Sequence, residues 1–229
     1  MRLYLFDVDG TLINAHGAGR LALTRAFEAV YGTAGPVQGY DFRGKTDPQI
    51  VFDLMTAGGI PEAVVQARLG ETFDTYVRHL DALITNGHPV EVMPGITEVL
   101  QALSLRRDVL VGLLTGNIER GAWAKLRPTG LRPFFRVGAF GSDDVDRRRL
   151  PGVARERAHA LVGYEVPFQN LFIIGDTPLD IDCAHACGAV AVAVATGHHS
   201  AEELAACSPD LLFPDFSDVS ATLLALTRG

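Results

Sequence analysis

The sequence has few cysteines and no long apolar segment. Its three cysteines, Cys183, Cys187 and Cys207, are an odd number in a chain of 229 residues, so a disulfide framework is not expected. The apolar run at residues 1–6 is far too short for a signal sequence or a membrane span. We therefore expect a cytoplasmic protein without a membrane partner.

The sequence also lacks an extended basic segment, and its formal net charge is −7. Binding to a nucleic-acid backbone needs clustered lysine and arginine, so nucleic acid is not an expected partner. A negative field repels anionic substrates, which means that a phosphate site in this chain needs local cations or a metal ion. With 48% hydrophobic and 21% charged residues, the composition is that of a globular protein large enough for a core and a smaller second domain.

Short apolar runs followed by polar turns predict the strands of a parallel sheet. The runs cover residues 3–6, 109–114, 171–174 and 190–194, with a weaker candidate at 134–140. Helical patterns lie between them or follow them, at 95–105, 118–126, 151–162, 178–187 and 201–207. This alternation indicates an α/β fold with a Rossmann-like parallel sheet, in which ligands bind at the carboxyl ends of the strands.

Residues 15–88 break this alternation, because they contain no strong strand candidate. Apolar residues recur there at helical spacing, as at Leu23, Phe27 and Val30. We interpret the segment as an all-helical domain inserted after the first strand. The α/β core then consists of residues 1–14 and 89–229.

The sharpest chemical signal is Asp7-Val8-Asp9-Gly10-Thr11, directly after the first predicted strand. Both carboxylates lie at the carboxyl end of this strand, where ligands bind in such sheets. One of them can then attack a substrate while the other exchanges a proton with the leaving oxygen. The alternative interpretation is a strand-end turn whose aspartates only cap a helix.

Two further motifs follow predicted strands. Thr115-Gly116-Asn117 offers a hydroxyl and backbone N–H groups to a phosphate oxygen, although the tripeptide is also a common turn. In the segment 175–180, Asp176 can present a hard oxygen to Mg²⁺, and Asp180 can support that ion or one of its water ligands. The alternative for this segment is a helix cap beside the positive end of the helix dipole.

Three consecutive arginines, Arg147, Arg148 and Arg149, precede a predicted helix. One of them would neutralise the charge of a phosphoryl group. The alternative is a solvated basic turn that answers the aspartates just before it.

With these motifs in this order, the sequence resembles the haloacid dehalogenase superfamily, and within it the phosphoglycolate-phosphatase-like group with a helical cap. The resemblance spans nearly the whole chain. It implies that Asp7 is the nucleophile and a metal ligand, and that Asp9 is the general acid/base and gives the metal its backbone carbonyl. It further implies that Thr115, Gly116 and Asn117 bind the phosphate. Asp176 would complete the metal shell, with Asp180 beside it.

The chain departs from the family at the third motif, where the family usually has a lysine and this sequence has only arginines. We take Arg147 as the first choice because it follows an acidic turn, while Arg148 and Arg149 stay open. Similar proteins discriminate substrates through a loop of the cap, which the segment 42–48 resembles. Arg43 and Lys45 in that segment could meet a substrate carboxylate, or could belong to an exposed helix-capping turn.

The resemblance implies a Mg²⁺-dependent phosphatase that hydrolyses a small phosphomonoester, such as 2-phosphoglycolate, through an aspartyl-phosphate on Asp7. A phosphonatase would need a Schiff-base lysine in the cap, for which Lys45 is the only candidate. A phosphosugar mutase on the same fold would return the phosphate to its product. Asp9 argues against a dehalogenase, and the helical insertion argues against a non-enzymatic phospho-receiver module.

Overall fold

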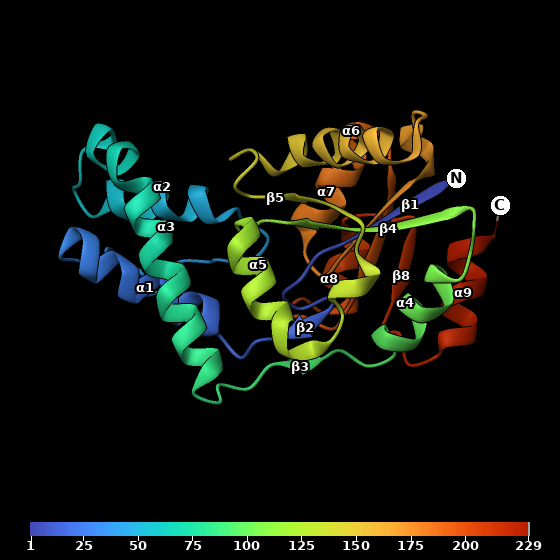
Figure 1. Cartoon of the computed structure of the whole chain (residues 1–229), viewed down its shortest axis with the longest axis horizontal. Coiled ribbons are helices and arrows are strands. Elements are labelled where there is room, and N and C mark those ends of the chain that lie inside the picture. Colours follow the sequence, from blue (N-terminus) through green and yellow to red (C-terminus); the bar gives the residue numbers. More distant parts are fainter. Residues whose placement is uncertain (229) are drawn as a thin grey trace.

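The computed structural model describes residues 1–228, and its centre is a parallel sheet of six strands in the order β5-β4-β1-β6-β7-β8 (Figure 1). The strands are β1 (Arg2–Phe6), β4 (Val109–Thr115), β5 (Val137–Phe140), β6 (Leu171–Gly175), β7 (Val190–Val194) and β8 (Leu211–Phe213). The strands are joined by helical crossovers, which confirms the predicted α/β class and its Rossmann-like sheet. The first strand lies in the middle, between β4 and β6.

Two layers of helices cover the sheet, because both faces of its strands are apolar. Along β1, Tyr4 and Phe6 belong to one buried cluster, while Leu3 and Leu5 belong to the other. One face packs against α4 (Ile96–Ser104), α5 (Glu119–Leu126) and α9 (Val219–Thr227). The other face packs against α6 (Leu150–Val162), α7 (Pro178–Cys187) and α8 (Ala201–Ala206). Short 3₁₀ turns join these elements, at η1 (Arg127–Thr129), η2 (Arg132–Phe134), η3 (Arg147–Arg149) and η4 (Phe168–Asn170).

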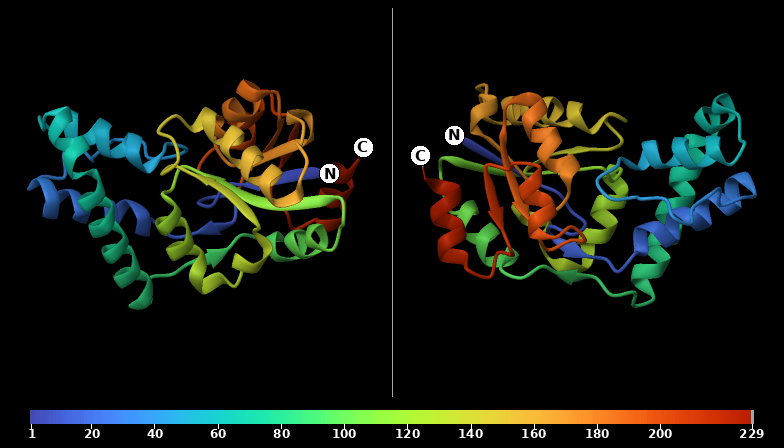
Figure 2. Two further views of the ribbon diagram at one scale, coloured as in Figure 1. Left: turned by 45° about the horizontal axis from the view of Figure 1, so that its top comes forward. Right: turned by 180° about the vertical axis from the view of Figure 1, so that it is seen from behind.

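Between residues 15 and 90 the chain forms three helices, called the cap below: α1 (Ala18–Tyr31), α2 (Asp47–Ala57) and α3 (Glu62–Thr85). They lie beyond the carboxyl ends of the sheet strands, at the opposite end of the molecule from both termini (Figures 1 and 2). A two-stranded antiparallel ribbon, β2 (Ile13–Asn14) with β3 (Glu91–Val92), marks where the chain leaves the core and returns to it. Among residues 1–228, no helix combines the length and apolarity that a membrane-spanning segment needs.

Several elements differ from the sequence-based expectation. The weak strand candidate at 134–140 is a strand only from Val137. The residues before it, Arg132–Phe134, form a 3₁₀ turn with a proline near its start. The ribbon strands have two residues each, which is too short to show alternation. The edge strand β8 and the last helix, α9, were also not expected. β8 has three half-buried residues, so it gives no distinct apolar run.

The start of α2 is bonded directly to the core. The backbone N–H of Asp47 donates to the carbonyl of Gly116 at 2.7 Å, and the Asp47 carboxylate accepts from the N–H of Ile118 at 2.8 Å. The hydroxyl of Thr46 donates to the carbonyl of Val145 at 2.8 Å. A Cβ atom on Gly116 would lie 2.0 Å from the carbonyl oxygen of Lys45, so only glycine permits this approach. The cap loop therefore rests on the turn that follows β4.

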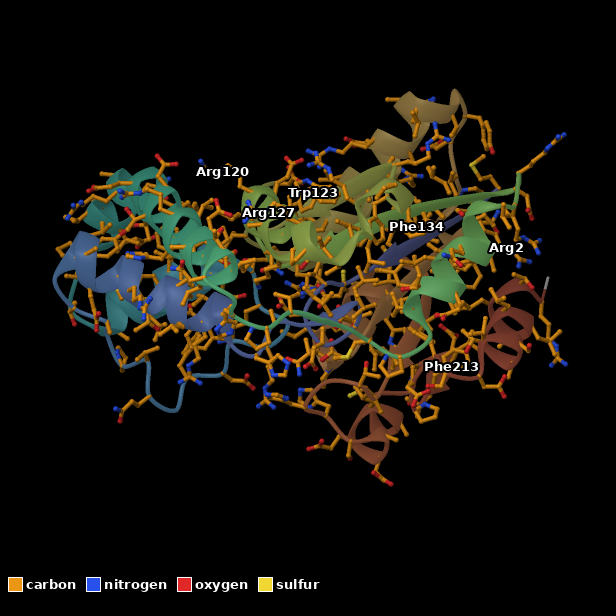
Figure 3. All side chains as sticks on the ribbon, turned by 60° about the horizontal axis from the view of Figure 1, so that its bottom comes forward. Arg2, Arg120, Trp123, Arg127, Phe134 and Phe213 are labelled. Atoms are coloured by element: carbon orange, nitrogen blue, oxygen red, sulfur yellow. The ribbon has the colours of Figure 1, made fainter. Side chains whose placement is uncertain are left out.

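A second contact joins the cap to α5. Arg120 pairs with Asp74 of α3, and Arg127 pairs with Asp81 of α3 at 3.0 Å. Both arginines project at the boundary between the cap and α5 (Figure 3). The side chain of Tyr76 of α3 is almost fully buried, and a Cβ atom on Gly121 of α5 would lie 3.1 Å from its ring. Helix α5 thus packs directly against α3.

Asp47 makes the stability of the cap–core contact depend on pH. Burial raises the pKa of Asp47 to about 6, against the opposing effects of the Lys125 charge and the Ile118 N–H. Between the unfolded value and this pKa the folded protein binds more protons than the unfolded chain, so this group destabilises the fold progressively as the pH rises through that window. Asp47→Asn keeps an acceptor for Ile118, and we expect it to be more stable than the wild type by roughly 1–3 kcal/mol at pH 8.

The measurement is urea unfolding at pH 8 and near pH 4, where the advantage of Asp47→Asn should vanish. Asp47→Ala is the matched control, because it also removes the charge but leaves the Ile118 N–H without its acceptor. Equal destabilisation of Asp47→Asn at both pH values would contradict the expectation.

Candidate active site

Strand β1 places the two aspartates of the first motif at the centre of the sheet edge. Phe6, the last residue of β1, pairs with Leu113 of β4 and Ile174 of β6, so the next residue emerges between the ends of both neighbours. The backbone N–H of Asp7 continues the ladder with a hydrogen bond of 2.9 Å to the carbonyl of Ile174. The side chain of Asp7 is 7% exposed, whereas that of Asp9 is 43% exposed. The two carboxylates therefore occupy different environments, one buried and one open.

The turn after Asp9 requires its glycine. Gly10 has a φ of 82°, which side-chain-bearing residues rarely adopt. A Cβ atom on Gly10 would also lie 2.3 Å from Oδ2 of Asp176. The hydroxyl of Thr11 donates to Oδ1 of Asp176 at 3.0 Å. The first motif and the last motif are thus in direct contact, across 165 residues of sequence.

Three buried carboxylates gather at this point. Ligand atoms of Asp7, Asp176 and Asp180 all lie within 4.8 Å of one another. Burial raises the pKa of Asp7 to about 6, although Arg147 opposes the shift. Burial, together with the charges of Asp180 and Asp7, raises the pKa of Asp176 well above its usual value. Oδ1 of Asp7 is buried and has no hydrogen-bond partner among the described residues.

The three carboxylates differ in whether their oxygens are free to bind a metal ion or are already hydrogen-bonded within the protein. Oδ2 of Asp180 accepts from the N–H and the hydroxyl of Thr177 at 3.0 and 2.7 Å, and its Oδ1 accepts from Arg147. Both oxygens of Asp180 are therefore engaged within the protein. Asp7 and Asp176 each keep an oxygen without a hydrogen bond among residues 1–228. A divalent cation fits this all-oxygen, negatively charged donor set, with Asp7 and Asp176 as its direct side-chain candidates and Asp180 behind them.

Arg147 is the cation inside the cluster. Its side chain is 7% exposed, and it contacts Asp180 and also Oδ1 of Asp7, the latter at 3.4 Å. Burial by itself lowers the pKa of Arg147, but the charges of Asp180 and Asp7 outweigh burial and raise it, so the guanidinium stays charged. It also donates to the carbonyl of Gly44 in the cap at 2.9 Å.

The other two arginines of the run point elsewhere. Arg148 pairs with Asp146 at 3.0 Å, and Arg149 pairs with Asp144 at 3.5 Å; both are exposed. The sequence did not decide which of the three arginines would be near a phosphoryl group, and in the structure only Arg147 of the three lies beside Asp7.

The motif after β4 lies beside Asp9. The amide nitrogen of Asn117 donates to Oδ2 of Asp9 at 2.9 Å and to the hydroxyl of Thr115 at 2.8 Å. The carbonyl of Gly116 is the acceptor for the cap N–H described above. Thr115 and Asn117 are both buried, and with Gly116 they line the same cavity as the aspartates.

Sequence reasoning missed Lys125, which belongs to this group. Its Nζ donates to Oδ2 of Asp9 at 2.6 Å and to Oδ1 of Asn117 at 2.6 Å, and its side chain is 5% exposed. The only signal in the sequence is a lysine among the buried residues Ala122, Ala124 and Leu126. A long cation on the apolar face of a helix calls for a buried partner.

The predicted cap cations line the cavity, but each has a partner of its own. Arg43 pairs with Asp41 at 2.7 Å. The amine of Lys45 donates to the hydroxyl of Tyr40 at 2.9 Å, lies 3.3 Å from Asp53, and sits 4.1 Å from the centre of the Tyr40 ring. The contacts of Lys45 connect it to the body of the cap rather than leaving it exposed.

A second residue that sequence reasoning missed is Arg20 of α1. It also lines the cavity, and its guanidinium donates to the carbonyl of Val37 at 2.9 Å and lies 5.0 Å from the centre of the Phe42 ring. No carboxylate pairs with Arg20 among the described residues. The cavity measures about 530 Å³ and is enclosed by the sheet edge on one side and the cap on the other.

We expect the effect of a metal ion on the melting temperature to depend on Asp176 and not on an acidic residue at the surface. Asp176→Asn removes a buried like charge, so we expect the metal-free variant to melt at a higher temperature than the metal-free wild type. Mg²⁺ should raise the melting temperature of the wild type, by a margin corresponding to about 2.7 kcal/mol at a concentration of roughly 100 Kd, and should leave Asp176→Asn unchanged. Differential scanning calorimetry with Mg²⁺ or with EDTA measures both effects.

Asp182→Asn, at an exposed position of α7, is the matched control and should behave like the wild type. An undiminished Mg²⁺ response in Asp176→Asn would show that the ion binds elsewhere.

Comparison with known proteins agrees with this geometry. Residues 1–188 match the family model described as haloacid dehalogenase-like hydrolase. The phosphoglycolate phosphatase of Synechococcus elongatus is 28% identical over 230 residues, covering 100% of both chains. That of Pseudomonas putida is 27% identical over 214 residues, covering 93% of this chain and 76% of the relative. A crystal structure of a hydrolase from Pseudomonas syringae, 17% identical and covering 100% of both chains, shares the fold with a TM-score of 0.75. The chain is therefore an enzyme of the haloacid dehalogenase-like hydrolase family, as its motifs predicted.

Proposed function

We propose that this hydrolase is a Mg²⁺-dependent phosphatase that cleaves a small phosphomonoester through an aspartyl-phosphate on Asp7. One observation carries the proposal. Asp7 is buried next to Arg147, at 3.4 Å, and within the acidic cluster, while Asp9 lies two residues away with an exposed carboxylate in the same cavity. A nucleophile beside a cation and a proton carrier beside the leaving group are what a two-step phosphoryl transfer needs.

In the first step an oxygen of Asp7 attacks phosphorus, and the bond between phosphorus and the ester oxygen breaks. Asp9 gives its proton to that leaving oxygen. Arg147, Thr115 and Asn117 surround the position of the phosphoryl group and stabilise its negative charge. In the second step water attacks phosphorus, Asp9 takes the proton from the water, and the bond to Asp7 breaks to release inorganic phosphate.

Mg²⁺, held by Asp7, Asp176 and the backbone carbonyl of Asp9, would supply neutralisation of the charge on both the phosphoryl group and the Asp7 carboxylate. The buried cluster supports this assignment, because three carboxylates face a single guanidinium there. Asp180 supports the site through Arg147 and the Thr177 turn.

The cap suggests a substrate that is small and carries a second negative charge. The cavity of about 530 Å³ has room for a metabolite rather than a polymer. Arg20, Arg43 and Lys45 line its cap side. Two of these have carboxylate partners and Arg20 has none among the described residues, so we add Arg20 to the residues that would meet a substrate carboxylate. The relatives named phosphoglycolate phosphatase agree with a carboxylated phosphomonoester such as 2-phosphoglycolate.

The proposal predicts which compounds release phosphate. Wild-type enzyme with Mg²⁺ should hydrolyse small phosphomonoesters, with higher kcat/KM for carboxylated compounds such as 2-phosphoglycolate than for uncharged ones of similar size such as ethyl phosphate. Asp7→Asn should lose activity by more than about 1,000-fold while keeping its fold, because the amide cannot act as the nucleophile. A free-phosphate assay with Mg²⁺ or with EDTA, beside circular dichroism, makes the measurement.

The outcomes separate the rival activities on this fold. Phosphate transfer to another position of a sugar phosphate, without phosphate release, would indicate a phosphosugar mutase. Inactivation by borohydride in the presence of a phosphonoaldehyde would indicate a phosphonatase that uses Lys45. Substantial activity in Asp7→Asn would contradict the proposed nucleophile.

A further inference from the structure

The sequence has only two lysines, Lys45 and Lys125, and both line the active-site cavity. Lys45 belongs to the cap. Lys125 belongs to α5 in the core, and none of the motifs described above contains it. Its almost complete burial is unusual for a lysine and requires a specific partner.

Lys125 completes a closed network around Asp9. The amine donates to Oδ2 of Asp9 and to Oδ1 of Asn117, each at 2.6 Å. The amide nitrogen of Asn117 in turn donates to Oδ2 of Asp9 and to the hydroxyl of Thr115. An ammonium group can only donate, so it fixes which end of the Asn117 amide faces it and which end faces Asp9.

The network treats the two oxygens of Asp9 differently. Oδ2 receives both hydrogen bonds, whereas Oδ1 has none among the described residues, and the side chain remains 43% exposed to the cavity. One oxygen is therefore anchored and the other is available to exchange a proton. A carboxylate that is fixed in this manner loses less orientational freedom when it meets the leaving group or the attacking water.

The cap shapes the space for the amine. A Cβ atom on Gly19 of α1 would lie 2.8 Å from Nζ of Lys125, and a Cβ atom on Gly121 of α5 would lie 3.1 Å from the ring of Tyr76 in α3. Two cap helices thus close over Lys125, and a side chain at position 19 would displace its amine.

We infer that Lys125 is a positioning residue for the proton transfers of Asp9: it holds Oδ2 of Asp9 and the Asn117 amide so that Oδ1 faces the reacting phosphoryl group. This inference rests on the proposed role of Asp9 as general acid/base. Lys125 gives up no proton in either step. The proton on the leaving oxygen comes from Asp9, and the proton of the attacking water goes to Asp9.

The inference predicts a loss that depends on the leaving group. Lys125→Met keeps the length of the side chain and removes its charge, and its kcat for an alkyl phosphate should fall by roughly 10- to 100-fold, a part of the usual acid–base contribution, with little change in KM. The first-turnover burst of nitrophenol from p-nitrophenyl phosphate should stay within about threefold of the wild-type rate, because that leaving group needs no proton. Stopped-flow and steady-state kinetics measure the two quantities.

Two further variants keep the test decisive if Lys125→Met folds poorly. Gly19→Ala displaces the amine but favours helix α1 through the higher helix propensity of alanine, so it should show the same kinetic pattern with an unchanged or raised melting temperature. Lys45→Met is the matched control for loss of a lysine in the cavity, and it should raise KM for a carboxylated substrate without affecting the leaving-group dependence.

A double mutant identifies the partner. If Lys125 acts through Asp9, then Asp9→Asn combined with Lys125→Met should be no slower than Asp9→Asn alone. Additive losses, or an equal loss of the nitrophenol burst and of alkyl phosphate turnover, would overturn the inference. A wild type that releases no phosphate, or an Asp9→Asn variant without leaving-group dependence, would instead refute the proposed function.

Discussion

Burying three carboxylates within 4.8 Å of one another sets the main electrostatic constraint on this molecule. Burial raises the pKa values of Asp7 and Asp176, and the like charges of the neighbouring carboxylates raise them further. Arg147 offsets part of this repulsion by contacting two of the three. The remaining negative charge suits the site to a divalent cation, whose own charge would then attract a phosphate group.

The same constraint joins the cap to the core. Arg147 reaches both the cluster and the carbonyl of Gly44, so the cation that balances the carboxylates also anchors the cap loop. Asp47, at the start of α2, is bonded to the turn that carries Thr115 and Asn117. The charge of Lys125 acts on Asp47 as well as on Asp9. The cap is therefore part of the electrostatic structure of the site, in addition to closing the cavity.

The family, the parallel sheet and three motifs, at residues 7–11, 115–117 and 175–180, could be predicted from the sequence because each of these motifs lies at the end of an apolar strand. The local sequence shows which residues end a strand, and the carboxyl ends of parallel strands lie at one edge of the sheet. Motifs at these ends are therefore expected to share one site. Lys125 and Arg20 could not be predicted as site residues, because only tertiary folding brings them to the site. Lys125 meets Asp9 and Asn117 there, and Arg20 meets the cavity under the cap. The engagement of Oδ1 of Asp180 is equally invisible in the sequence, since it depends on an arginine 33 residues away. The short edge strand β8 and the ribbon lack the length that makes a pattern readable.

The most direct test of this account is to trap and locate the phosphoryl group on the enzyme. Rapid acid quenching of the enzyme during turnover of a labelled phosphomonoester, followed by borohydride reduction and peptide mass spectrometry, reports which carboxylate carried the phosphate. The account predicts one acyl-phosphate per active site, on Asp7, and its absence when Mg²⁺ is removed. Label on a different residue, or full turnover with no covalent species on Asp7, would contradict the assignment on which the rest depends.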